Sequence, residues 1–199
     1  MRRLRSIILR TTMLAILPVS LAGCGINAIP TKEEAAKAKF ADVQTQYQRR
    51  GDLIPNLVNT VQANAQQERT VLVEVTQARA RATQTTVDPS KLTDPQAIQR
   101  YQAAQDQLSG ALGRLMVIVE KYPELKSNEN FLALQSQLEG TENRIAIARQ
   151  DYITAVKNYN TEIRTIPGRW WRALLYPDAE PMQNFSVAEG TEQVPEVKF

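Results

Sequence analysis

The chain has 199 residues, no histidine, one cysteine and a formal net charge of +3. Without histidine it has no imidazole base, no Ser-His-Asp or Cys-His nucleophile pair and none of the usual histidine ligands for zinc. A single cysteine also excludes a disulfide within the chain.

The first 23 residues have the composition of a secretory signal. They contain four arginines and no acidic residue, and a short apolar run covers residues 11–19. This run contains Pro18 and is shorter than the roughly 20 apolar residues that span a bilayer. It leads to Leu21-Ala22-Gly23-Cys24, which resembles the lipobox of bacterial lipoproteins. The resemblance implies cleavage before Cys24 and acyl chains on that cysteine; an ordinary signal peptide that contains a cysteine by chance is the alternative.

Cleavage of residues 1–23 changes the expected charge of the mature chain. Four of the 24 basic side chains and none of the 21 acidic ones lie in the signal, so residues 24–199 carry 20 basic and 21 acidic side chains. The positive charge thus belongs to the signal, and no nucleic-acid partner is predicted.

The residue after the predicted cleavage site bears on the choice of membrane. Gly25 follows Cys24, where an aspartate would signal retention in the inner membrane. In a cell with two membranes we therefore predict an outer-membrane lipoprotein that faces the periplasm. In a cell with one membrane we predict the extracellular face of the cell membrane.

Residues 24–31 are predicted to be a tether, and a helix is expected to start at Thr31. Apolar residues then recur at gaps of three and four as far as Ala82, which is the heptad spacing of a helix that packs against other helices. Pro55 lacks the N–H that would donate to the Gly51 carbonyl, so we expect a bend at this point. A complete break of the helix there is the alternative.

Two further helices are predicted after the turn-forming cluster at residues 87–95. Thr93 or Asp94 is a suitable N-cap for the first of them, and its heptad seam covers residues 98–122. The seam of the second covers residues 131–166 and is followed by a Pro-Gly pair that ends it.

These segments predict an all-α fold. Long helices joined by short connections pack antiparallel, and heptad spacing favours crossing angles near 20°. We therefore expect an elongated antiparallel up-and-down bundle over residues 32–168, with three long helices, or four if the first breaks near Pro55. Residues 169–199 form a C-terminal tail, and its prolines make the part after Tyr176 extended or disordered. The Trp170-Trp171 segment is expected to cap the bundle core, with contact to a bilayer interface or a partner as the alternative.

Two separated segments resemble the signature of the LemA family. The first is YQRRGDLIPNLV at residues 47–58, and the second starts as ENRIA at residues 142–146 and continues to IPG at residues 166–168. The resemblance extends from about residue 30 to the end of the chain. It implies a membrane-attached, extracytoplasmic bundle of antiparallel helices with no established enzymatic activity. Many LemA proteins keep an uncleaved N-terminal transmembrane helix, whereas this chain has a predicted cleavable signal.

Charged and amide residues in these two segments form the candidate site. They are Arg49, Arg50, Asp52, Asn56, Glu142, Arg144 and Asp151. Charges that face a bundle interior are unfavourable unless they are paired, so we predict a buried polar network in which Arg49 or Arg50 pairs with Glu142 or Asp151 and fixes the helix register. Asn64 and Glu68, polar residues of the first seam, can extend it. The alternative is a ligand pocket at the Pro55 bend, built around the free Gly51 carbonyl.

The residue types indicate a protein without enzymatic activity, and no catalytic residue, metal site or cofactor is predicted. We expect a lipid-anchored scaffold of the cell envelope that holds an unidentified protein partner near the membrane. The alternative is an adaptor or chaperone-like factor that serves a membrane protease or envelope quality control. An enzyme that uses the carboxylates of Asp52, Glu142 and Asp151 is a third hypothesis.

Overall fold

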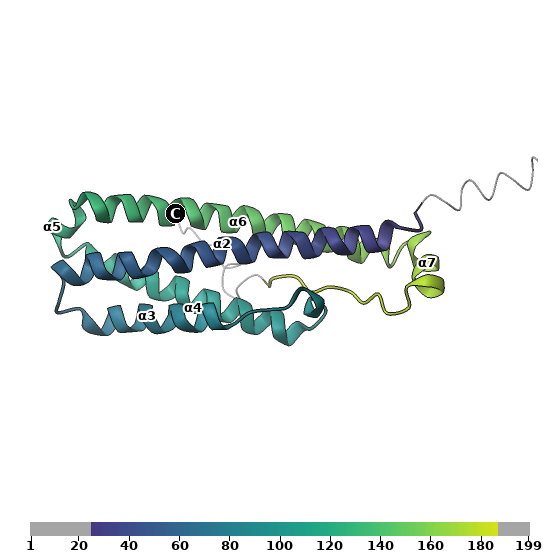
Figure 1. Ribbon diagram of the computed structural model, residues 1–199, viewed down its shortest axis with the longest axis horizontal. Coiled ribbons are helices and arrows are strands. Elements are labelled where there is room, and N and C mark those ends of the chain that lie inside the picture. The colour runs from purple at the N-terminus through teal and green to yellow at the C-terminus, as the bar shows by residue number, and fades with distance from the viewer. Residues whose placement is uncertain (1–24, 187–199) are drawn as a thin grey trace, which may run out of the picture.

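The computed structural model describes residues 25–186, which form helices joined by short connections (Figure 1). No strand occurs among these residues, so the predicted all-α bundle is confirmed. The predicted signal, Cys24 and residues 187–199 lie outside the described part. The helices are α2 (Ala28–Asn64), α3 (Arg69–Gln84), the 3₁₀ turn η1 (Pro89–Lys91), α4 (Pro95–Val119), α5 (Pro123–Lys126), α6 (Glu129–Glu162) and α7 (Gly168–Leu175).

The two longest helices, α2 and α6, lie side by side along the molecule (Figure 1). The α3–α4 hairpin packs against the half of this pair that is distant from α7, and the buried residues there form one core cluster. A second cluster fills the half next to α7, where the chain around η1, the start of α4 and the segment after α7 cover the helix pair. Because a 37-residue helix such as α2 is about 55 Å long, the molecule has the expected elongated shape.

Helix α2 begins and ends earlier than predicted. Its first residue is Ala28, so the expected start at Thr31 was wrong and the non-helical tether is shorter than residues 24–31. The helix continues through Pro55, so the alternative of a complete break at that residue was also wrong. It ends at Asn64, which is exposed instead of lying in the seam, and the chain then reverses direction.

The reversal at residues 65–68 explains why the predicted first helix is two helices. This turn consists of Ala, Gln, Gln and Glu, so it contains no glycine or proline that signals a break in the sequence. Buried apolar residues also continue across it at nearly helical intervals, with Val61 before the turn and Leu72 and Val75 after it. The bundle therefore has four long helices, and the additional break follows Asn64.

The start of α4 follows the predicted capping chemistry. The Asp94 carboxylate accepts hydrogen bonds from the backbone N–H groups of Gln96 and Ala97, at 2.8 and 3.3 Å, and Pro95 is the first helical residue. The Asn128 side chain caps α6 in the same way. These caps fix where two of the four long helices begin.

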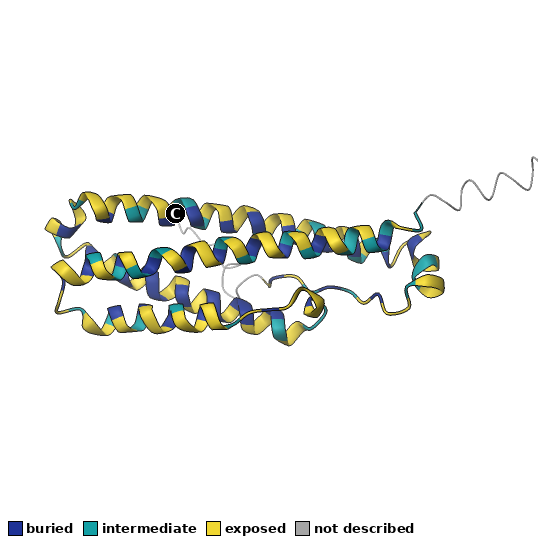
Figure 2. Cartoon of the chain, in the orientation of Figure 1, coloured by how far each residue is buried: buried dark blue, intermediate teal, exposed yellow. Residues whose placement is uncertain are grey.

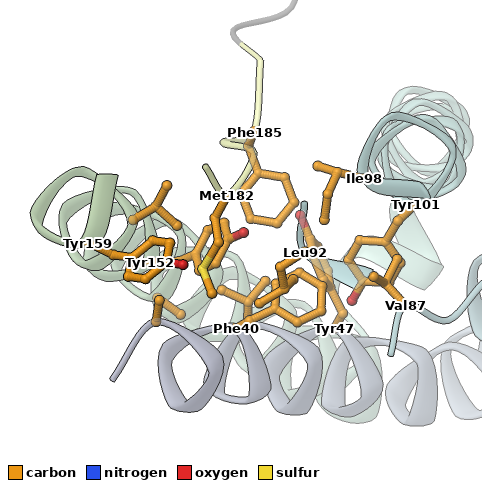
Figure 3. Packing of buried hydrophobic residues seen from close by; sticks show 14 of the residues in the cluster. Phe40, Tyr47, Val87, Leu92, Ile98, Tyr101, Tyr152, Tyr159, Met182 and Phe185 are labelled. Atoms are coloured by element: carbon orange, nitrogen blue, oxygen red, sulfur yellow. The ribbon is translucent and has the colours of Figure 1, made fainter. Parts of the chain in front are cut away.

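The core in the half next to α7 is an aromatic cluster (Figure 3). The ring centroid of Phe40 on α2 lies 5.3 Å from that of Tyr152 on α6 and 5.7 Å from that of Tyr101 on α4. Phe185, from the chain after α7, completes the cluster, with centroid distances of 5.3 Å to Tyr152 and 6.3 Å to Phe40. Aromatic pairs at such distances add to the stabilisation that burial of the rings provides.

Residues 176–186, here called the C-terminal strap, are held against the bundle by side-chain amides. The Asn160 amide donates to the Met182 carbonyl and accepts from the Met182 N–H, both at 2.9 Å. The Gln102 amide donates to the Ser186 carbonyl at 2.7 Å and accepts from its N–H at 3.0 Å. The strap has no regular secondary structure beyond a short turn, as its prolines predicted, but its burial against the helices was not predicted.

The Trp170-Trp171 segment lies in α7, at the end of the bundle where α2 begins (Figure 1). Trp171 packs against the aromatic half of the core, as the capping prediction required, whereas Trp170 is exposed. Within residues 25–186, no helix combines the length and the apolar character needed to cross a membrane.

Candidate functional site

Arg50 is buried in the middle of the bundle with a side chain only 1% exposed. Heptad spacing places it on the core face of α2, between the buried residues Tyr47 and Ile54. Its guanidinium lies over the Tyr47 ring, with Cζ 4.9 Å from the ring centroid. A cation in this position must be compensated by acceptors from the neighbouring helices.

Acceptors from α4 and α6 surround the Arg50 guanidinium. Nη1 donates to Ser109 Oγ at 2.8 Å and to Glu142 Oε1 at 3.0 Å. Nη2 donates to the side-chain oxygen of Gln105 at 2.7 Å and to its backbone carbonyl at 3.2 Å. The Glu142 side chain is 42% exposed, so the ion pair lies at the boundary between core and solvent. Of the three guanidinium nitrogens of Arg50, Nε alone has no acceptor among the described residues.

Gln105 extends the network to the remaining long helix. Its side-chain Nε2 donates to the carbonyl of Ala82 in the last turn of α3, at 3.1 Å. Helix termini leave carbonyls without intrahelical partners, and Gln105 satisfies one of them. The polar groups on α2, α3, α4 and α6 are therefore joined through Arg50 and Gln105, here called the Arg50 network.

The Gly51 carbonyl also has a partner inside the protein. Pro55 cannot donate to it, and the Arg79 Nε of α3 donates to it instead, at 2.6 Å. The alternative of a ligand pocket required this carbonyl to be free. An open pocket of about 330 Å³ lies beside the network, with Asp52 and Tyr101 among the residues that line it.

The structure brings together two of the seven predicted site residues, Arg50 and Glu142. Asp151 forms its ion pair with Lys39, at 3.0 Å, and not with an arginine. The other four side chains are exposed; they are Arg49, Asp52, Asn56 and Arg144. The heptad phase explains this difference for α2, because Arg50 falls on the core face and its neighbours do not.

The seam residues Asn64 and Glu68 do not extend the network. Asn64 is exposed, and Glu68 accepts a hydrogen bond from the hydroxyl of Tyr122, at 3.0 Å, near the turn that joins α2 and α3. This bond raises the pKa of Tyr122, because it stabilises the neutral phenol beside a carboxylate.

Three partners in the site were not predicted, namely Gln105, Ser109 and Arg79. Gln105 occupies a seam position of the second predicted helix, so its polar side chain on an apolar face was a usable signal. Ser109 lies one turn further along α4, and nothing in the sequence distinguishes it from other exposed serines. Arg79 lies beside the seam, and only the packing of α3 against α2 reveals its role.

Burial affects the tyrosines next to the network. Removal from water raises the pKa of Tyr47 and Tyr101, and Arg50 opposes this change by favouring the phenolate. Both phenols are thus neutral near pH 7. Within residues 25–186 no group of three or more Cys, Asp or Glu side chains is placed to hold a metal ion.

Comparison with known proteins places this architecture in a family. The family model described as LemA family matches residues 39–199, which contain the Arg50 network and the strap. Magnetosome proteins MamQ 2 and MamQ 1 of Paramagnetospirillum magneticum are 28% identical to the chain over 170 residues, which cover 75% of the chain and 60% of each relative. Magnetosome protein MamQ of Magnetospirillum gryphiswaldense is 28% identical over 161 residues, or 71% of the chain and 58% of the relative. The chain thus spans about 60% of the length of the curated relatives it matches, and by the extent of its match to the family model it belongs to the LemA family.

Proposed function

We propose that this LemA-family chain is a non-enzymatic, lipid-anchored protein of the cell envelope, whose helical bundle holds a protein partner near the membrane. The observation that carries the proposal is the lipobox-like Leu21-Ala22-Gly23-Cys24, after which α2 begins within four residues. A chain acylated at Cys24 would hold the start of the bundle next to the lipid. Membership of the LemA family supports a membrane-associated role.

The use of the buried polar groups supports a scaffold more than an enzyme. Arg50, Gln105 and Glu142 satisfy one another across the bundle, and Arg79 occupies the Gly51 carbonyl. A group that is saturated by structural hydrogen bonds is not available to a substrate. What the bundle offers a partner instead is a long helical surface of exposed residues (Figure 2).

The anchor is tested by Cys24→Ser in the native host. We expect the wild-type protein to be cleaved, to incorporate a labelled fatty acid and to fractionate with membranes, in the outer membrane if the cell has two. The Cys24→Ser protein should lose the label and the cleavage. Ser20→Ala, a change outside the lipobox-like residues, is the matched control and should behave as wild type. A Cys24→Ser protein that is still cleaved and membrane-bound would contradict lipidation as the sole anchor.

The scaffold role is tested by crosslinking in intact cells followed by mass spectrometry. One partner recovered in defined stoichiometry supports it. A broad set of unfolded proteins would contradict it and favour the chaperone-like alternative, and a membrane protease as the defined partner would favour the adaptor. A double variant, Glu142→Gln with Asp151→Asn, should fold and complement a deletion strain, and that result would rule out an enzyme that uses these carboxylates.

A further inference from the structure

Helix α7 lies where the chain arrives from the predicted lipid anchor. The first described residue, Gly25, follows Cys24 directly and sits against α7 and the turn before it. A carbon added to its Cα would lie 3.7 Å from Pro167 Cγ and 3.8 Å from Trp171 Nε1. Acyl chains on Cys24 would therefore bring the end of the bundle that carries α7 next to the bilayer surface (Figure 1).

One face of this region is apolar and points away from the bundle. Ile166, Trp170 and Leu174 are spaced four residues apart and are 63%, 62% and 72% exposed. Trp170 and Leu174 lie in α7 and, four residues apart, share one side of that helix, whereas Ile166 lies in the turn just before it. Half of the eight most exposed large apolar residues in the described chain fall within residues 166–175, so this is a local concentration and not the scatter that any protein surface shows.

Three arginines flank this face. Arg164 and Arg169 are exposed and Arg172 is half-buried, and none of the three forms an ion pair with another described residue. The nearest acid on α6, Glu162, is already paired with Lys32. Apolar and aromatic side chains flanked by arginines match an interface in which anionic headgroups lie over acyl chains.

We propose that Trp170 and Leu174 of α7, together with Ile166 from the turn before it, insert into the headgroup region of the membrane that carries the Cys24 acyl chains; these three residues are here called the outer face of α7. The proposal rests on the lipid anchor proposed above. Three apolar residues bind a bilayer weakly alone, but the anchor holds them at high local concentration beside it. Two contacts in place of one would fix the angle between the bundle and the membrane.

The chain offers a specific probe, because its two tryptophans are both in α7. The lipidated protein is reconstituted into vesicles of phosphatidylethanolamine and phosphatidylglycerol, with and without brominated acyl chains that quench tryptophan. In a Trp171→Phe variant, which retains Trp170, we expect brominated lipid to reduce emission by about twofold. In the matched Trp170→Phe variant the inward Trp171 should be quenched much less.

Substitutions that leave both tryptophans in place separate insertion from anchoring. Leu174→Glu should abolish the quenching while the protein still floats with the vesicles. Val117→Glu, which charges an equally exposed apolar residue on α4, should change neither readout. Protein that floats while Trp170 remains unquenched would overturn the contact and leave the anchor intact. Wild-type protein that does not float at all would overturn both, and a blue shift without vesicles that grows with protein concentration would assign the face to a second copy.

Discussion

At the scale of single residues, Arg50 determines how α2, α4 and α6 align. Its four hydrogen bonds reach Gln105 and Ser109 on one helix and Glu142 on another. A shift of α2 by one heptad would keep apolar residues in the seam but would move the guanidinium out of reach of these acceptors. Apolar heptad contacts tolerate such shifts better than a buried cation does, so the network selects one register.

Arg50→Met should lower the free energy of unfolding by about 2–3 kcal/mol. The variant removes the donor on which the buried side-chain oxygen of Gln105 depends, and an unsatisfied buried acceptor is unfavourable. The loss of partner at Glu142 should add little, because that carboxylate is partly exposed and can be hydrated. Urea denaturation followed by circular dichroism measures the change.

Arg49→Met is the control for this experiment, since it removes the same charge from the adjacent, exposed position. It should change stability by less than about 0.5 kcal/mol. Equal effects of the two substitutions would contradict the structural role of Arg50.

The residue scale also limits what can be read from the sequence. Heptad phase identifies Arg50 as inward and predicts an acidic partner on the third predicted helix, and Glu142 provides it. The same motif contains Arg49, Asp52 and Asn56, which are exposed. A motif therefore reports which residues occur together, whereas only the helix phase separates the buried one from its neighbours.

At the scale of elements, α2 shows how a helix continues through proline. Pro55 leaves the Gly51 carbonyl without its intrahelical donor, and Arg79 of α3 replaces that donor. The interruption in one helix thus becomes a contact between two. This contact holds α3 against α2 beside the Arg50 network.

A double-mutant cycle tests this substitution of donors. Pro55→Ala restores an N–H at position 55 that can donate to the Gly51 carbonyl. Arg79→Met should therefore cost about 1 kcal/mol more in the wild-type background than in the Pro55→Ala background. Differential scanning calorimetry of the four proteins gives the coupling.

The neighbouring Arg81 provides the control for the cycle, because it is exposed on the same helix. Arg81→Met should have the same small effect in both backgrounds. Additive behaviour of Arg79→Met with Pro55→Ala would show that the two residues do not share the Gly51 carbonyl.

Element boundaries were predictable where local chemistry marks them. Asp94 and Pro95 start α4 as their capping and φ preferences require. The end of α2 at Asn64 has no such mark, since the turn that follows contains neither glycine nor proline. That boundary arises from packing, because α3 buries its apolar face only if it folds back on α2 and α4.

At the scale of the whole molecule, the elongated all-α shape followed from heptad seams and short connections, but the strap did not. An extended segment has no periodicity, so Met182 and Phe185 carry no sign in the sequence that they enter the core. Phe185 contacts the rings of Phe40 and Tyr152, which heptad spacing alone predicts to pack against other helices. In the structure, these rings pack against both the neighbouring helices and the strap.

The aromatic core predicts that stability falls at alkaline pH. Burial raises the pKa of Tyr47, Tyr101, Tyr152 and Tyr159 above the value of about 10 that they have when unfolded. The folded protein therefore retains protons that the unfolded chain releases, so stability is constant with respect to these groups below about pH 10 and decreases above it.

Tyr101→Phe isolates one of these groups. Its difference in stability from wild type should be constant up to about pH 9 and should then change in favour of the variant, by up to about 1.4 kcal/mol per pH unit. Urea midpoints of both proteins measured from pH 7 to pH 11 give this difference, and the values below pH 9 serve as its baseline. A difference that stays constant to pH 11 would contradict the assignment.

The C-terminal strap also sets the order in which the fold can be completed. Translation proceeds from the N-terminus, so Phe40 and Tyr152 are synthesised before Met182 and Phe185. Until the strap has been synthesised, the side of the aromatic cluster that the strap covers stays exposed to solvent. Exposed apolar rings are prone to aggregate or to bind chaperones. The core formed by α3, α4 and the adjoining parts of α2 and α6 contains no strap residue. The end of the bundle distant from α7 can therefore fold first, and the end that carries α7 can fold last.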